Sequence, residues 1–219
     1  MIGFTGLDFG SFGTDEIELF IFANTNDPVT FQIWEGEPEK EGSCLLSDCF
    51  YHKPPKWMVF QEQSYRLCQR VRGNAQIYLA TNDGFQLRGI RFLKQEKAYA
   101  RLYAGECDRI YGDAYECRDL RIEKIGNNVT LEFIDLDFGE KGADQITLCC
   151  HSTQKLNPIQ IRFTMETGSS IQVVEVKEST DYGEQKFVLE TLKGKGKLEL
   201  IFLPGSCFDL EWLQFQKLK

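Results

Sequence analysis

The sequence predicts an all-β fold of two tandem β-sandwich modules, and three observations support this. Short segments with alternating apolar and polar residues recur along the chain, separated by Gly, Pro, Asp and Asn. No long amphipathic helix is evident. The stretch Leu7–Leu19, LDFGSFGTDEIEL, returns 129 residues later as Leu136–Leu148, LDFGEKGADQITL, with eight of thirteen positions identical.

The repeat predicts two modules within 219 residues, over 1–95 and 96–219. Its period exceeds the roughly 20–50 residues of solenoid repeats and matches the size of a whole domain. A hydrophobic content of 42% with 17 Phe is enough for two compact cores. In both copies of LDFG we expect the Asp, Asp8 and Asp137, to bond its own backbone at a strand-to-loop turn.

The second module has seven segments with the period of a half-buried strand, as is typical of a β-sandwich. These segments are 129–133, 146–150, 159–165, 171–176, 186–192, 197–203 and 209–215. One further segment, LRIEKIG at 120–126, is predicted as a short helical turn.

The first module repeats this order at 16–22, 27–34 and 73–92, where a net deletion places Phe85 opposite Phe208. Ahead of LDFG, however, the first copy has six residues where the second has about 35. The first module is therefore predicted to lack its N-terminal strands, as expected if the chain is cut from a longer one. Open sheet edges would favour self-association.

Charge and hydropathy argue against two classes of partner. The net charge of −8 and the lack of a basic stripe with interleaved aromatics argue against nucleic acid. No apolar run approaches the ~20 residues of a membrane span, so no membrane partner is expected. No basic and apolar leader marks a signal peptide.

The eight cysteines are irregularly spaced, and domains of this size do not need disulfides for stability. We therefore expect most of them to be buried small apolar residues. A reduced compartment, such as the bacterial cytoplasm, is favoured.

Four strings carry a family resemblance. They are YAGECDRIYGDAYE, IEKIGNNVTLEFIDLDFGEKGA, PIQIRF and FLPGSCFDLEWLQF. They resemble the C-terminal accessory modules of bacterial family 2 glycoside hydrolases of the β-galactosidase type, which are similar to family 6 carbohydrate-binding modules. The resemblance covers 98–216 and, less closely, 1–95. It implies a galactose-binding-like jelly roll, and it implies that the catalytic barrel lies outside this chain.

The resemblance also implies a sugar site in the loops of the second module. Aromatic rings there stack on the apolar face of a sugar, and an Asn pairs with hydroxyl groups. The early-loop aromatics are Tyr111 and Tyr115, and the late-loop aromatic is Tyr182. The Asn position falls on Cys207, which cannot replace an amide that both donates and accepts.

In the first module the resemblance gives Trp57 as the late-loop aromatic. The Asn position falls on Gly84, with Asn82 close by. The family often holds a structural calcium ion, for which the resemblance implies Asp209 and Glu106. The Glu position of the family falls on Gly105, one residue before Glu106, so one of the oxygen ligands that calcium needs is displaced.

Three functions follow. The first is a non-catalytic pair of modules that binds carbohydrate, of galactose type, and helps to dock the catalytic domain of the parent enzyme. The second is a structural or oligomerisation role after loss of sugar binding, which the departures at Cys207 and Gly84 favour. The third is an independent hydrolase, which would need its own turnover of a nitrophenyl galactoside.

Overall fold

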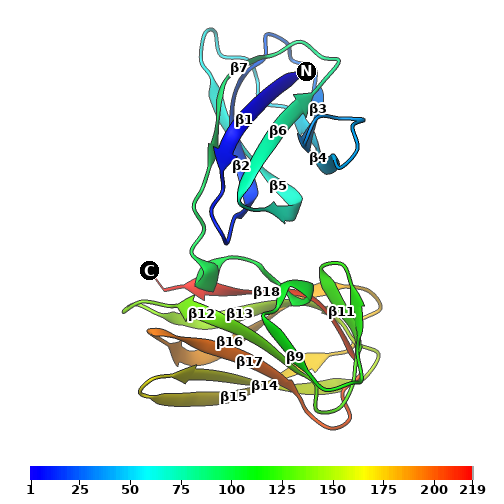
Figure 1. Cartoon of the computed structure of the whole chain (residues 1–219), viewed down its shortest axis with the longest axis vertical. Helices are drawn as coiled ribbons and strands as arrows, with labels where there is room; N and C mark the ends of the chain where they lie inside the picture. The colour runs from blue at the N-terminus through cyan, green and yellow to red at the C-terminus, as the bar shows by residue number, and fades with distance from the viewer. Residues whose placement is uncertain (219) are drawn as a thin grey trace. The chain divides into compact units, whose positions relative to one another are not determined.

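The computed structural model describes residues 1–218, and the predicted all-β fold is confirmed. The chain divides into two compact units, Met1–Gln95 and Glu96–Lys219. Each unit has its own sheets and its own hydrophobic core (Figure 1). We describe the two units separately as unit 1 and unit 2.

Unit 1 is built from seven antiparallel strands in two facing sheets. The strands are β1 (Ile2–Asp8), β2 (Thr14–Phe22), β3 (Val29–Glu35), β4 (Cys44–Tyr51), β5 (Gln61–Val71), β6 (Asn74–Ala80) and β7 (Gln86–Phe92). One sheet has the order β1-β6-β3-β4, and the other has the order β5-β2-β7.

The core of unit 1 follows from the alternation along its strands. Ile17, Leu19 and Ile21 of β2 are completely buried, and Ile33 of β3 and Ile77 of β6 meet them from the facing sheet. Because successive side chains of a strand point to opposite faces, the intervening residues of β3 and β6 lie on the outer face of the four-stranded sheet.

Unit 2 is a larger sandwich with short 3-10 turns at its start. Its elements are η1 (Lys97–Tyr99), β8 (Leu102–Tyr103), η2 (Ala104–Glu106), β9 (Arg109–Tyr111), β10 (Glu116–Arg118), β11 (Arg121–Ile125), β12 (Thr130–Asp137), β13 (Ala143–His151), β14 (Leu156–Met165), β15 (Gly168–Lys177), β16 (Gly183–Leu192), β17 (Lys195–Phe202) and β18 (Phe208–Lys217). The sheet orders are β10-β11-β18-β13-β16, with β8 also paired to β18, and β15-β14-β17-β12-β9.

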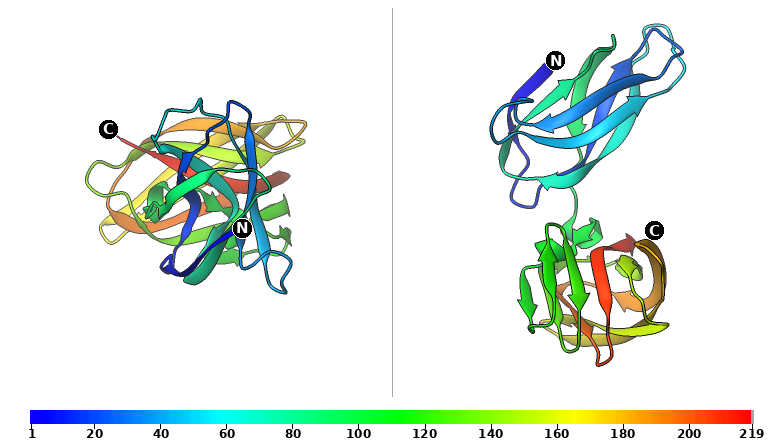
Figure 2. Two further views of the ribbon diagram at one scale, coloured as in Figure 1. Left: turned by 90° about the horizontal axis from the view of Figure 1, so that it is seen from above. Right: turned by 90° about the vertical axis from the view of Figure 1, so that its right-hand side faces the viewer.

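Aromatic rings fill the space between the two sheets of unit 2. Phe138 packs edge-on against Phe163 at 5.1 Å and against Phe215 at 4.9 Å between ring centroids. The right-hand view of Figure 2 shows the strands of this unit curving around a common interior. Such edge-to-face aromatic packing is favourable beyond the apolar area that it buries.

The segment predicted as a helical turn is strand β11, and that prediction was wrong. Ile122 and Ile125 are both buried although they lie three residues apart, a spacing that also suits a helix. Lys124 adopts a positive φ of 54°, and the pairing with β18 shifts register between the two isoleucines. This bulge lets both isoleucines point to the same side of the strand.

The strand orders of the two units correspond one to one. The order β1-β6-β3-β4 matches β12-β17-β14-β15, and β5-β2-β7 matches β16-β13-β18. The ladder pairs Phe92 with Ile17 and Phe215 with Ile146, so the two phenylalanines hold the same position. Strands β8 to β11 have no counterpart among the strands of unit 1.

The repeated LDFG string forms the same corner in both units. The Asp8 carboxylate accepts from the backbone N–H of Gly10 at 2.9 Å, and Asp137 accepts from Gly139 at 2.9 Å. Both glycines adopt positive φ angles, 70° and 60°. The expected turn role of these two carboxylates is confirmed.

Among the described residues, no helix is long and apolar enough to cross a membrane.

Candidate functional site

The outer face of the four-stranded sheet in unit 1 carries an aromatic pair. Trp34 of β3 stands directly opposite Tyr78 of β6 in the antiparallel ladder, and both side chains are half-buried. Gly3 of β1 stands on the other side of Tyr78. A Cβ at Gly3 would lie 2.6 Å from Cε1 of Tyr78, so the ring extends over the glycine.

Polar groups continue this row of side chains. The indole Nε1 of Trp34 donates to Oε1 of Gln32 at 3.0 Å. Nε2 of Gln32 donates in turn to Oδ1 of Asp48 on β4 at 2.8 Å. We call Tyr78, Trp34, Gln32 and Asp48 the Trp34 strip. It combines apolar ring faces with amide and carboxylate groups, which is the chemistry that suits a sugar.

A concavity of about 740 Å³ adjoins the Trp34 strip. Gln32 and Asp48 belong to both, and Thr30, Phe50 and Asn82 are among the other residues that line the concavity. The structure therefore places the predicted residue Asn82 beside the strip. Its side chain is exposed, so its amide can donate and accept hydrogen bonds.

The loop that carries Asn82 is fixed to β3 by its neighbour Asp83. Oδ2 of Asp83 accepts from the backbone N–H of Thr30 at 2.7 Å and from its hydroxyl at 2.8 Å. These two hydrogen bonds lower the pKa of Asp83 from its ordinary value, so the carboxylate stays ionised at neutral pH. The hydroxyl of Thr81 adds a bond to the carbonyl of Thr30 at 2.8 Å.

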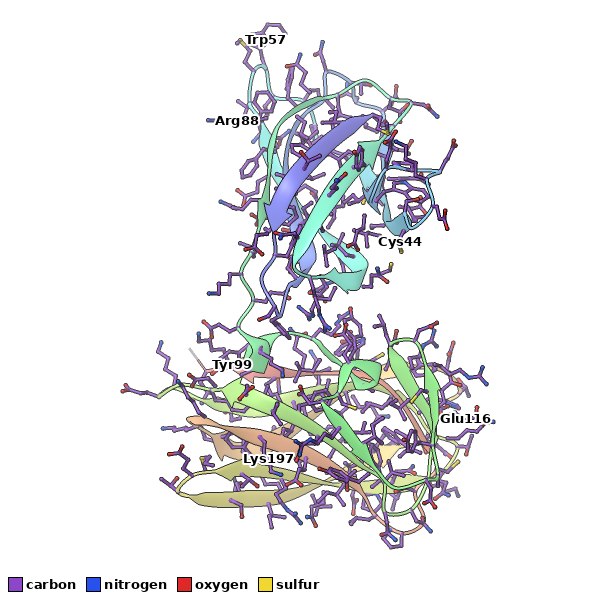
Figure 3. All side chains as sticks on the ribbon, viewed as in Figure 1. Cys44, Trp57, Arg88, Tyr99, Glu116 and Lys197 are labelled. Carbon is purple, nitrogen blue, oxygen red and sulfur yellow. The ribbon has the colours of Figure 1, made fainter. Side chains whose placement is uncertain are left out.

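The matching face of unit 2 is charged. The ladders align Trp34 with Arg162 and Tyr78 with Glu199. Arg162 and Glu199 lie 3.7 Å apart as an ion pair. Lys197, labelled in Figure 3, pairs with Glu132 at 2.6 Å on the same sheet. Ion pairs occupy this face where unit 1 has its aromatic pair, so it lacks the open ring surface of the Trp34 strip.

The predicted late-loop aromatic of unit 2, Tyr182, packs against the outer face of the six-stranded sheet. It joins a small cluster with Tyr103, Cys149 and Trp212. The Arg121 guanidinium lies over the Tyr182 ring, 5.1 Å from its centroid. Burial raises the pKa of Tyr182 to about 12, and the charge of Asp209 adds to this shift. One face of the ring is therefore already occupied.

Tyr111 and Tyr115 lie elsewhere in unit 2. Tyr111 ends β9, the edge strand of the five-stranded sheet, and its side chain is 47% exposed. Tyr115 is half-buried in the loop between β9 and β10. Tyr182 lies against the other sheet, so the structure does not bring these three aromatics to one face.

Cys207, at the Asn position of the family, is exposed and belongs to a network centred on the buried Asn157. The Oδ1 of Asn157 accepts from the backbone N–H of Cys207 at 3.3 Å, and its Nδ2 donates to the Ser152 hydroxyl at 2.5 Å. Ser152 donates to the Cys207 carbonyl at 2.8 Å. The network fixes two loops to each other, and Asn157 is its buried hub.

Trp57 lies in the loop between β4 and β5 and is 77% exposed. Figure 3 shows it at the far end of this loop, pointing away from the body of unit 1. Trp57 is not among the residues that line the concavity beside the Trp34 strip.

The residues expected for calcium do not fit that ion. Oδ1 of Asp209 accepts from the backbone N–H of Lys124 at 2.7 Å, and Oδ2 faces Nδ1 of His151 at 3.1 Å. A Cβ at Gly105 would lie 2.2 Å from the carbonyl oxygen of Asp119, so no side chain can stand at the family's Glu position. Glu106 ends η2. Within residues 1–218, no three His, Cys, Asp or Glu side chains gather as a metal site.

The buried thiols are poorly suited to nucleophilic chemistry. All eight cysteines are free; three are buried, two are half-buried and three are exposed, so the expectation that most would be buried was wrong. Burial raises the pKa of Cys49 to about 11 and those of Cys107, Cys149 and Cys150 to about 12. Thiols with such values stay protonated at neutral pH, whereas a thiolate is the reactive form.

Comparison with known proteins finds similar solved structures. No family model and no curated protein matches this chain. CsCBM6-3 from Clostridium stercorarium, in complex with cellobiose, is 23% identical, covering 55% of this chain and 95% of its own, with a TM-score of 0.48. A family 6 carbohydrate-binding module from Clostridium cellulolyticum, in complex with xylose, is 23% identical over 54% of this chain and 98% of its own, with a TM-score of 0.47.

A third solved structure, a β-1,3-glucan-binding module from Bacillus halodurans, is 19% identical, covers 54% of this chain and 96% of its own, and has a TM-score of 0.45. These structural neighbours are carbohydrate-binding modules.

Sequence reasoning missed Tyr78, Gln32 and Asp48. The alternation around Trp34 was available as a signal, because Val29, Phe31 and Ile33 occupy the inward positions and leave 30, 32 and 34 outward. The pairing of β3 with β6, which brings Tyr78 to Trp34, depends on the sheet order and has no local sequence signal.

Proposed function

We propose that this chain is a non-catalytic carbohydrate-binding region of a bacterial glycoside hydrolase, and that unit 1 contacts the glycan through the Trp34 strip. The observation that carries the proposal is the aromatic pair Trp34–Tyr78, continuous with the amide and carboxylate of Gln32 and Asp48. Sugar rings stack on aromatic faces, and their hydroxyl groups need partners that donate and accept.

The concavity beside the strip extends the proposed contact. Asn82 offers an amide at its rim, and the Asp83–Thr30 bonds hold the loop that carries it. A strip with an adjoining concavity suits several units of a glycan chain rather than a single ring. The sequence resemblance supports a galactose-type glycan and a parent enzyme of the β-galactosidase type, with the catalytic domain outside this chain.

The chemistry of the strip favours binding over catalysis. A glycosidase needs a carboxylic acid with a raised pKa to protonate the leaving group. Near the strip, Asp83 has a lowered pKa and accepts two hydrogen bonds from Thr30, so it is held as an anion. Asp48 accepts from Gln32. Both carboxylates act as acceptors that position neighbouring groups.

The second candidate function is a structural one, favoured by unit 2. Its matching face is covered by ion pairs, Tyr182 is packed, and Cys207 stands at the family's Asn position. Unit 2 would then dock against the parent enzyme. Self-association through unit 1 is a further part of this candidate.

A glycan array on the purified chain tests the proposal. The variant Trp34→Ala removes the ring, and Arg162→Ala is the matched control at the same sheet position of unit 2. We expect a hexose-type signal that weakens by about tenfold or more, or ~1.4 kcal/mol, in Trp34→Ala and persists in Arg162→Ala.

Two results decide against the assigned site or function. A signal that Trp34→Ala retains and Tyr182→Ala or Trp57→Ala loses would move the site to the loops expected from the sequence. A silent array with a folded wild-type protein, judged by its circular dichroism, would favour the structural candidate.

A further inference from the structure

Unit 1 lacks a cover that unit 2 possesses. Seven apolar residues on β12, β18 and the adjoining turns of unit 2 are between 0% and 2% exposed. They are Phe133, Leu136, Phe138, Phe208, Leu210, Leu213 and Phe215. Their counterparts in unit 1, by ladder register, pack against the core but are only partly buried. These counterparts are Phe4, Leu7, Phe9, Phe85, Leu87, Ile90 and Phe92.

The cover in unit 2 is the segment 98–125. Its strand β9 pairs with β12, and its strands β8 and β11 pair with β18 (Figure 1). This segment contributes completely buried side chains of its own, including Ala104, Ile122 and Ile125. The segment therefore pairs with the outer sides of β12 and β18 and shields the apolar residues beneath.

The corresponding strands of unit 1 end their sheets. β1 is the edge of the four-stranded sheet, and β7 is the edge of the three-stranded sheet. Edge strands present backbone N–H and C=O groups that can accept a further strand. In unit 1 these two open edges lie next to the seven partly buried apolar residues. A strand that added to either edge could therefore both hydrogen-bond to its backbone and bury apolar side chains.

We propose that β1 and β7 form a docking surface for an extended polypeptide segment of the kind seen at 98–125. The segment adds one antiparallel strand to each edge and buries alternate aliphatic side chains on the seven apolar residues. The mode is strand addition, in which backbone bonds give affinity and side-chain pockets give specificity.

Unit 2 argues for a segment rather than for a second copy of the chain. Its cover reaches both sheets at once, pairing with β12 of one and β18 of the other. A second unit 1 that pairs its own β7 with β7 would close the three-stranded sheet and leave β1 open.

A synthetic peptide with the sequence of residues 96–126 tests the proposal on the intact chain under reducing conditions. Binding is followed by hydrogen exchange of the backbone amides with mass spectrometry. We expect one peptide per chain and a slowing of exchange by about tenfold or more within 1–8 and 85–92. The control peptide carries Ile122→Asp and Ile125→Asp, so the protein itself stays unchanged, and we expect no protection from it.

Three outcomes would overturn the proposal. The first is unchanged exchange in β1 and β7 at saturating peptide. The second is protection confined to β12 and β18, which would mean exchange with the resident segment of unit 2. The third is a chain that without peptide already sediments as a dimer with protected β7 amides, which would make a second copy the occupant. None of these outcomes depends on whether the glycan array gives a signal.

Discussion

Trp34 and Arg162 occupy the same position in two matching sheets, and the surrounding residues differ accordingly. Around Trp34 are Tyr78 and the small residue Gly3, whereas around Arg162 are Glu199 and the neighbouring Glu132. Exposed charged pairs on a protein surface add little stability. The aromatic pair leaves apolar ring surface open to a ligand. At the scale of single residues, this difference separates the proposed binding face of unit 1 from the charged face of unit 2.

Asp15 is a buried carboxylate of unit 1 that lies between two arginines. It is completely buried, with Oδ2 bonded to Nη1 of Arg66 at 2.9 Å and Oδ1 bonded to Nε2 of Gln95 at 2.8 Å. The side chain of Arg70 is also completely buried and lies 3.9 Å from Oδ1. Burial alone would raise the pKa of Asp15, but Gln95 and the two arginines together lower it.

We expect Asp15→Asn to destabilise unit 1 by about 3 kcal/mol, because Arg70 keeps its buried charge and loses a charged partner. The wild-type carboxylate has a lowered folded-state pKa, so its contribution is present above the unfolded-state pKa and is lost as the pH falls from there through the folded-state pKa. Urea unfolding between pH 7 and pH 3 should therefore show a flatter pH dependence in Asp15→Asn.

The matched control is Glu37→Gln, which removes the surface partner of Lys40 and should change the free energy of unfolding by less than about 0.5 kcal/mol. If Asp15→Asn and the wild type were equally stable at neutral pH, the Asp15 carboxylate would not stabilise unit 1 by compensating the charge of Arg70.

At the scale of elements, the corner after LDFG in unit 2 contains two glycines that are needed for different reasons. Gly142 follows this corner with a φ of 87°, and a Cβ there would lie 2.4 Å from the carbonyl oxygen of Leu192. Gly139 has a φ of 60° but open space around its Cα. Gly139 is therefore needed for its backbone conformation alone. Gly142 is needed both for its backbone conformation and because the backbone of Leu192 lies so close to it.

We expect Gly142→Ala to destabilise unit 2 by about 3 kcal/mol, since both strain and a clash with backbone must be relieved. Gly139→Ala should lower the free energy of unfolding by only about 1 kcal/mol, because only its positive φ is unfavourable for alanine. Urea unfolding followed by circular dichroism compares the two variants. Equal losses in both would show that the close approach to Leu192 does not matter.

Local alternation in the sequence predicted β12 to β18 of unit 2 and β2, β3, β6 and β7 of unit 1, but it gave no segment for β1, β4, β5 or β8 to β10. It failed at β11, where a bulge at Lys124 places Ile122 and Ile125 on one side and imitates helical spacing. It also could not place the cluster around Tyr182, because Arg121 and Trp212 reach it from strands distant in sequence. Alternation predicts on which face of a sheet a side chain lies. It does not predict which residues of other strands lie beside it, because that depends on the strand order.

At the scale of the whole molecule, the two units share one strand order but differ in their sheet edges and in the side chains on their outer faces. Unit 2 pairs the segment 98–125 with β12 and β18 and carries ion pairs on its outer sheet face. Unit 1 leaves β1 and β7 open and carries the Trp34 strip. We therefore propose that unit 1 contacts the glycan and that its open edges have a separate role in binding polypeptide.

The most direct test of glycan contact is an NMR titration of the three tryptophan indole N–H signals, from Trp34, Trp57 and Trp212. Trp34→Phe identifies one signal by its loss. On titration of the wild-type chain with galactose-type oligosaccharides, we predict that this signal shifts while the other two stay in place. A shift confined to Trp57 or Trp212, or no shift at millimolar oligosaccharide, would contradict the assignment of glycan binding to the Trp34 strip.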